Sequence, residues 1–215
     1  MITRWIPAVF LALFIGIGFG WRMWLQWRRF GHSGLALFQS GRWVQHAREA
    51  SLFVAALLLG YQVLEAGLAP ARVSYLAPLA ALGAPGFALG LLLAFGGLAL
   101  MVRAQLEMGA SWRIGVDESA RPGLVTHGLY RWTRNPIYLA MFLAFGGLML
   151  MLPTWITLIA LVGTLIGVQR QVREEEAYLV RTYGDEFRSY AARVGRFVPG
   201  LGLYPRSGGG ALLAR

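Results

Sequence analysis

Two groups of polar residues in this chain lie directly beside strongly apolar segments. The first occupies residues 128–138 and includes Tyr130, Arg134 and Asn135. The second is Arg173, followed by three consecutive glutamates at positions 174–176. Charge at the edge of a bilayer is costly, so charged residues there often mark a functional site. The two groups therefore offer guanidinium and carboxylate groups that can bind the polar parts of a ligand.

The first group predicts a loop that leads into a helix. Pro136 suits the first helical turn, where its missing N–H costs nothing, and the residue before a proline is held extended. Unpaired N–H groups at such a helix start can hold a carboxylate or a ribose oxygen. The alternative is an ordinary span boundary, with arginines at the interface and Tyr138 as an anchor.

The second group places three carboxylates at the end of an apolar segment. Successive helical residues point about 100° apart, so at most one or two of these side chains can face the same partner. We expect one to pair with Arg170 or Arg173 and another to lie in a cleft, where it can accept hydrogen bonds from hydroxyl or amino groups. The alternative is an acidic face in contact with solvent.

Composition indicates a membrane protein with one compact domain. Of the 215 residues, 57% are hydrophobic and only 14% are charged. Cysteine is absent and the three histidines lack metal-ligand spacing, so we predict no disulfide and no metal site. All 20 positive side chains are arginines, and the net charge is +10. In a membrane protein this charge favours anionic lipid, and not nucleic acid, as the partner.

Five apolar segments are candidates to cross about 30 Å of hydrocarbon, which takes about 20 helical residues. The expected spans are residues 6–20, 50–68, 85–102, 137–152 and a segment from 154 past 169, with a shorter helix or re-entrant piece at 73–82. Only Pro153 and Thr154 separate the last two spans, which must form a tight hairpin. Beyond them we expect an amphipathic helix, a break at Gly184, a further helix capped by Asp185, and a flexible tail over 201–215. The sequence thus predicts an all-α, multi-span membrane helical bundle.

The arginines predict the orientation, because cytoplasmic loops carry an excess of positive charge. With the loop after the first span inside, only Arg4 and Arg72 lie outside. The cytoplasmic set is then Arg22, Arg28, Arg29, Arg42, Arg48, Arg103, Arg113, Arg121, Arg131, Arg134 and every arginine from Arg170 onward. Both polar groups therefore fall on the cytoplasmic side of an integral membrane protein, which we place in a bacterial inner membrane.

Residues 124–199 resemble the superfamily of isoprenylcysteine carboxyl methyltransferases and phospholipid methyltransferases. That family has a Gly-Pro-Tyr-x-x-x-Arg-His-Pro-x-Tyr motif, then a two-helix hairpin, then Glu-Glu-x-x-Leu-x-x-x-Phe-Gly-x-x-Tyr-x-x-Tyr. The matching residues are Gly128, Tyr130, Arg134, Pro136 and Tyr138, followed by Glu175, Glu176, Leu179, Tyr183, Gly184, Phe187 and Tyr190. Two positions differ: Leu129 stands where the family has proline, which we expect to loosen the turn, and Asn135 stands where it has histidine.

The resemblance implies an enzyme that uses S-adenosyl-L-methionine in a pocket closed by cytoplasmic C-terminal helices. Carried over residue by residue, the cofactor-binding set is Tyr130, Arg134, Asn135, Pro136, Tyr138, Glu175 and Glu176. Arg134 and Arg173 are the candidate catalytic residues, since a guanidinium can hold a carboxylate acceptor, which needs no base. An amine or thiol acceptor needs deprotonation, and no base for it is evident.

The predicted function is methyl transfer to a lipid-like or prenylated substrate from the bilayer, by carboxylate O-methylation or lipid amine N-methylation. We divide the chain into N-terminal helices (1–103) that form a substrate entrance, a methyltransferase core (104–200) and a tail (201–215). One alternative is a membrane NADPH-dependent reductase of the sterol-reductase type, although Ile137 departs from the pattern of those enzymes. The other is a non-enzymatic membrane scaffold. The acceptor and the oligomeric state are left open.

Overall fold

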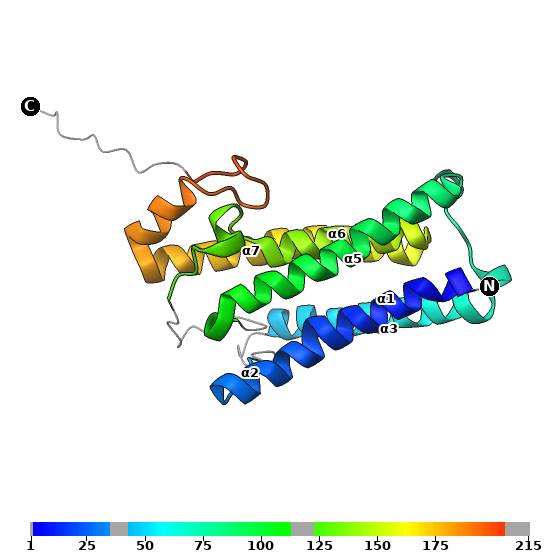
Figure 1. Cartoon of the computed structure of the whole chain (residues 1–215), viewed down its shortest axis with the longest axis horizontal. Coiled ribbons are helices and arrows are strands. Elements are labelled where there is room, and N and C mark those ends of the chain that lie inside the picture. The colour runs from blue at the N-terminus through cyan, green and yellow to red at the C-terminus, as the bar shows by residue number, and fades with distance from the viewer. Residues whose placement is uncertain (1, 35–42, 113–122, 205–215) are drawn as a thin grey trace, which may run out of the picture.

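The computed structural model describes residues 2–34, 43–112 and 123–204, and its long helices run side by side along the molecule (Figure 1). The α-helices are α1 (Ile6–Ile15), α2 (Arg22–Phe30), α3 (Trp43–Leu68), α4 (Ala77–Ala80), α5 (Gly83–Met108), α6 (Pro136–Met151) and α7 (Trp155–Ala191). A π-helix, η2 (Gly16–Trp21), joins α1 to α2. Short 3-10 turns are η1 (Ile2–Trp5), η3 (Pro70–Arg72), η4 (Gly109–Ser111) and η5 (Gly128–Arg131). The described residues contain no strand, only two isolated bridges, so the predicted all-α bundle is confirmed.

Four helical stretches are long and apolar enough to cross a membrane, and α6 is a shorter apolar helix. The four are Ile2–Phe30, Ala50–Leu68, Gly83–Ser111 and Trp155–Ala191. Together with α6 they match the five predicted spans in order, but two extend well beyond the predicted ends. The first runs on through η2 and α2, and the third continues to Met108. The fifth runs past 169 and continues as the expected amphipathic helix to Ala191.

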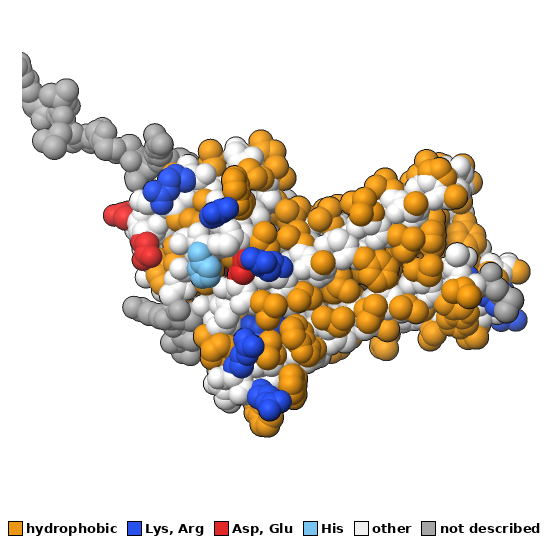
Figure 2. Space-filling view, viewed as in Figure 1, with side chains coloured by type: hydrophobic (Ala, Val, Ile, Leu, Met, Phe, Trp, Pro, Cys, Tyr) orange, Lys and Arg blue, Asp and Glu red, His pale blue; other side chains and the backbone are white. Residues whose placement is uncertain are grey.

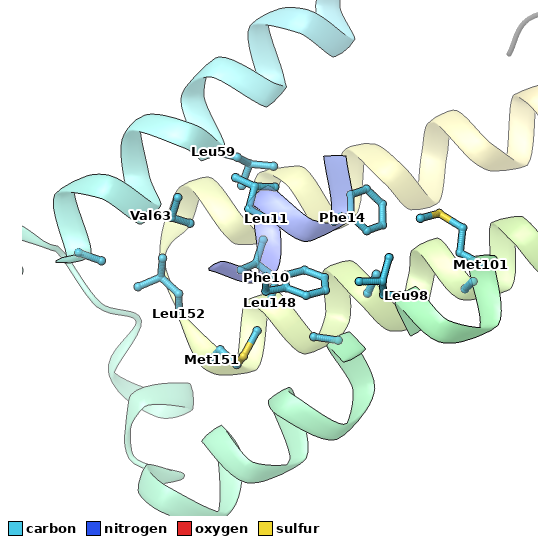
Figure 3. Close-up of a cluster of buried hydrophobic side chains, with 14 of the residues drawn as sticks. Phe10, Leu11, Phe14, Leu59, Val63, Leu98, Met101, Leu148, Met151 and Leu152 are labelled. Carbon is cyan, nitrogen blue, oxygen red and sulfur yellow. The ribbon is translucent and has the colours of Figure 1, made fainter. Parts of the chain in front are cut away.

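The core lies between α1, α3, α5 and α6, with the start of α7 packed against its edge (Figure 3). Phe10 and Phe14 of α1 pack among side chains of α5 and α6, including Met101 and Leu148. Helices α5 and α6 approach most closely at glycines: a Cβ on Gly147 would lie 2.3 Å from the backbone nitrogen of Ala94. Nearer the start of α6, a Cβ on Gly97 would lie 2.7 Å from the Ala140 carbonyl oxygen, so the close contact between the two helices extends towards the first polar group.

The α6–α7 hairpin forms as predicted. The Thr154 side chain accepts a hydrogen bond from the Thr157 backbone N–H at 3.3 Å, while the Thr157 hydroxyl lies 3.0 Å from the Thr154 N–H. This reciprocal capping box satisfies donors at the start of α7. The Leu76 N–H donates to the Pro153 carbonyl at 2.8 Å, which keeps the preceding chain extended. Of the shorter helix or re-entrant piece expected at 73–82, only the four residues of α4 are helical.

On the face shown in Figure 2, most charged side chains gather at one end of the molecule, over the C-terminal half of α7 and over α2, whereas the long helices are mostly hydrophobic. Within α7, Gly184 has a φ of 53°, so the break predicted there is confirmed, although the helix resumes at once. Asp185 pairs with Arg188 on the surface at 3.0 Å. The predicted cytoplasmic positions of Arg42, Arg113 and Arg121, and the tail from 205, lie outside the described residues.

Candidate functional site

The loop before α6 is fixed by Glu107, near the end of α5. The Leu129 backbone N–H donates to Glu107 Oε2 at 2.6 Å, while Arg103 binds the other carboxylate oxygen. Gly128 has a φ of 59°, and a Cβ there would lie 2.3 Å from Glu107 Oε2, so only glycine fits. The expectation that Leu129 loosens this turn is wrong, because its N–H, which proline lacks, supplies the anchor.

Tyr130 lies buried between α5 and α7. Its hydroxyl donates to the Ala104 carbonyl at 3.4 Å, and its own carbonyl accepts from the Tyr190 hydroxyl at 2.6 Å. Burial raises the pKa of the Tyr130 phenol well above its usual value, so this side chain stays neutral and protonated. Tyr130 therefore joins the loop to both helices through neutral hydrogen bonds.

Arg134 is buried and its guanidinium donates to protein groups only. Nε and Nη2 bind Glu176 Oε1 at 3.1 and 2.8 Å. Its other contacts are with the carbonyls of Ala191, Val194 and Gly202. The Arg134 side chain thus ties the loop to α7 and to the chain that follows it.

Glu176 is the centre of this buried ion network. Besides Arg134, it binds Arg196, whose Nε and Nη2 lie 3.1 and 2.6 Å from its two oxygens. Glu176 is thus not the glutamate that pairs with Arg170 or Arg173, because its partners come from distant segments. A carboxylate with two guanidinium partners is well compensated despite its burial.

Asn135 and Pro136 form the start of α6. The Asn135 amide donates to the Arg196 carbonyl at 3.0 Å, and its backbone N–H contacts the Thr133 hydroxyl at 3.3 Å. Pro136 is the first residue of α6, as predicted, and Asn135 makes no side-chain cap. The start of α6 therefore lacks the side-chain acceptor that commonly caps a helix.

Besides Arg134–Glu176, a second contact between the two polar groups is made by Tyr138 and Glu175. The Tyr138 hydroxyl donates to Glu175 Oε1 at 2.7 Å, and Gln171 donates to the same oxygen at 3.3 Å. Glu175 is half-buried, Glu176 is buried, and both Glu174 and Arg173 are exposed. The three glutamates thus divide as helical geometry predicts, with two facing the loop.

The structure therefore unites all seven predicted cofactor-binding residues and leaves Arg173 outside their contacts. Sequence reasoning missed Glu107, Gln171 and Arg196. A signal existed for Gln171, which lies one helical turn before Glu175 and hence on the same face. For Glu107 and Arg196 no local pattern indicates the distant partner. Among the described residues, no group of three or more potential side-chain ligands could hold a metal ion.

Comparison with known proteins agrees with this arrangement. Residues 85–186 match the phospholipid methyltransferase family. The fold is similar to that of a eukaryotic intramembrane Ras methyltransferase, an isoprenylcysteine carboxyl methyltransferase, with a TM-score of 0.57 and 20% identity over 93% of this chain and 77% of that one. Among curated proteins no match was found. The matched family segment contains the loop, α6 and the glutamates of α7.

Proposed function

We propose that this chain, related through residues 85–186 to the phospholipid methyltransferases, is an integral membrane enzyme that methylates a lipid-like acceptor with S-adenosyl-L-methionine. One observation carries the proposal. Two motifs far apart in the sequence meet at the charged end of an apolar bundle, through Tyr138–Glu175 and Arg134–Glu176. An ordinary span boundary would not require this pairing.

The donors and acceptors at this end suit S-adenosyl-L-methionine. The N-terminal end of α6, which receives no side-chain cap from Asn135, is the positive end of the helix dipole and suits a carboxylate or a ribose oxygen. Glu175 is half-buried and can accept from an ammonium or ribose hydroxyls, whereas both oxygens of Glu176 are already used by arginines. We therefore assign the cofactor contact to Glu175 and not to Glu176. When bound, the cofactor supplies a methyl group on a positively charged sulfur.

The protein's own residues then have two tasks. Arg134, Glu176 and Arg196 hold the chain after α7 against the start of α6, which keeps the pocket in one shape and limits water. Alignment of donor and acceptor is the main requirement of an in-line transfer, and a fixed pocket provides it. Since the Arg134 guanidinium is occupied by protein oxygens, we assign it this positioning role. Arg173 is exposed and stays a candidate for contact with the acceptor.

A lipid-like acceptor fits the surroundings of the site. The sides of the bundle expose large hydrophobic side chains, so a substrate in the bilayer can reach the charged end from the side (Figure 2). The phospholipid methyltransferase match favours a phospholipid, and the similar solved structure favours a prenylated cysteine. We place the charged end on the cytoplasmic side, where the arginine distribution puts it.

Calorimetry of the purified full chain tests the proposal. S-adenosyl-L-methionine should bind, and Glu175→Gln should weaken it about tenfold or more, the size of one hydrogen bond to a charged group. Glu186→Gln is the control, because Glu186 is an exposed carboxylate further along α7. Binding of NADPH in place of S-adenosyl-L-methionine would instead support the reductase alternative. The acceptor follows from the mass of any lipid that gains a labelled methyl group.

A further inference from the structure

Arg22, the first residue of α2, is buried without a carboxylate partner. Its side chain is 2% exposed, and none of the ion pairs among the described residues includes it. Its Nη2 donates to the carbonyls of Gln105 and Gly109 at 3.2 and 2.9 Å. These carbonyls belong to the C-terminal end of α5, where the helix dipole is negative and offsets part of the cost of a buried cation.

These contacts use only part of the Arg22 guanidinium. An arginine carries five N–H donors, and here both hydrogen bonds come from Nη2. Nε is buried and has no partner, and Nη1 donates to no group of the described residues. The guanidinium carbon lies 4.6 Å from the centre of the Trp112 ring, which fixes its plane. A planar, fixed guanidinium with unused donors is suited to bind a carboxylate or a phosphate.

Two buried glutamines beside Arg22 present unused acceptors. Gln26 donates through its amide nitrogen to the Ala110 carbonyl at 3.2 Å, and Gln105 donates to the Gly18 carbonyl at 2.9 Å. Because carbonyls only accept, these bonds fix which end of each amide is nitrogen. Both side-chain oxygens are buried and have no partner. A group that contains an anionic oxygen together with an N–H would satisfy the arginine and the glutamines.

The backbone before Arg22 is also unusual. Residues Gly16–Trp21 form the π-helix η2, and π-turns within helices are frequent at functional sites. Gly18, inside this turn, packs so closely on α5 that a Cβ would lie 2.2 Å from Met101 Cε. The turn therefore brings the Arg22 side chain against the end of α5.

Arg22 lies next to the proposed methyltransferase site. Tyr130, which belongs to the predicted cofactor set, donates to the Ala104 carbonyl, and Arg22 donates to the carbonyl of the next residue, Gln105. Yet Arg22 and Gln26 are outside residues 85–186, the part shared with the methyltransferase family. Residues outside the shared part are suited to recognise the acceptor, which differs between such enzymes, and not the common methyl donor.

We propose that Arg22 binds the anionic oxygen of the methyl acceptor, with Gln26 and Gln105 accepting from an adjacent N–H group. This assignment rests on the proposed function and names the acceptor class: a lipid whose head contains a carboxylate or phosphate next to an N–H. The carboxylate of an N-acylated prenylcysteine and the phosphate of an ethanolamine phospholipid both meet this description.

Binding to the full chain in detergent tests the inference in two arms. The first compares S-farnesyl-N-acetylcysteine with its carboxamide, and the second compares a short-chain phosphatidylethanolamine with an alkylamine that lacks the phosphate. Arg22→Gln should weaken the probe that carries the carboxylate or phosphate of one arm about tenfold or more, and the counterpart that lacks this anionic group less than about twofold. Arg28→Gln is the control, because Arg28 is exposed on the same helix. The arm that responds identifies the source of the anion.

Three results would overturn the inference: no preference of the wild type for either anionic probe, an unchanged preference in Arg22→Gln, or equal weakening of both members of a pair. Equal weakening would mean that Arg22 only clamps α2 to α5. If Arg22→Gln does not fold, Arg22→Lys decides, since it keeps the charge but loses the planar fork and should reduce the same preference. Binding of S-adenosyl-L-methionine to the wild type is measured in parallel. Its absence refutes the proposed function, whereas its presence with an unchanged acceptor preference refutes this inference alone.

Discussion

Glu176→Gln should release the chain after α7, residues 192–204, from the start of α6. Glu176 is the only carboxylate among the described residues that binds both Arg134 and Arg196. Its side chain is 6% exposed, and that of Arg134 is 2% exposed. The substitution keeps the shape and one acceptor oxygen but leaves the buried Arg134 guanidinium without a countercharge.

The expected cost follows from this burial. Removing one partner of a buried ion pair costs about 3–5 kcal/mol, because the other charge is left uncompensated. Glutamine can still accept one hydrogen bond, and Arg134 keeps its carbonyl partners at Ala191 and Gly202. We therefore expect about 2–3 kcal/mol, which raises the detached population of residues 192–204 about 30- to 150-fold.

Limited proteolysis measures that population, because cleavage follows the fraction of open chain when opening is fast. Trypsin should cut after Arg196, which is half-buried in the native state, about 30-fold faster or more in Glu176→Gln. Asp185→Asn is the matched control, since it breaks an exposed pair with Arg188 that is worth about 0–1 kcal/mol. Equal cleavage rates in the two variants would refute the view that Glu176 holds this segment.

Three further predictions concern the loop, the orientation and the helix contact. Asn135→His should keep the rate of methyl transfer at limiting cofactor. Asn135→Leu should lower that rate, because it loses the hydrogen bond to the Arg196 carbonyl, a loss of about 1–3 kcal/mol. A fully active Asn135→Leu would contradict this role. Single cysteines in place of Asp185 and of Trp155, which is 60% exposed, should react with impermeant reagents from opposite sides of the membrane, and labelling from one side would reject the topology. Gly147→Ala should lower the melting temperature because the added Cβ meets the α5 backbone. Gly146→Ala adds a Cβ in open space and should leave the melting temperature unchanged or raise it. Equal melting temperatures of the two variants would argue against the close contact.

The positions of the spans could be predicted from the sequence because length and hydropathy alone determine them. Their ends could not. The third span was predicted to end at 102, yet α5 continues to Met108 although Arg103, Gln105 and Glu107 are polar. Each of these side chains finds a partner: Arg103 binds Glu107, Gln105 binds the Gly18 carbonyl, and Glu107 binds the Leu129 N–H. The Arg103–Glu107 pair is a local contact at helical spacing, whereas Gly18 and Leu129 lie far from their partners in sequence and leave no periodic signal.

The sequence predicted two polar motifs, and the structure shows that they contact each other, but the sequence did not predict the different contacts of Glu175 and Glu176. The family resemblance placed Glu175 and Glu176 together, and the family match confirms that relationship. Sequence alone could not decide between them, because the choice depends on Arg196, which is separated from Glu176 by 20 positions and reaches it only after the turn beyond α7. Because Glu176 is buried and paired with two arginines, it holds segments of the protein together, whereas Glu175, which contacts Tyr138, is the half-buried carboxylate that we propose for the cofactor.

The two departures from the family motif show how this loop is held. Leu129 replaces a proline, and its N–H, which proline cannot provide, binds Glu107. Asn135 replaces a histidine, and its amide binds the Arg196 carbonyl, a neutral contact that requires no proton transfer. One bond ties the loop to the end of α5 and the other ties it to the chain after α7. Neither Leu129 nor Asn135 acts as an acid or a base in these contacts. The geometry therefore fits a transfer reaction that depends on alignment of the reactants and not on protonation at position 135.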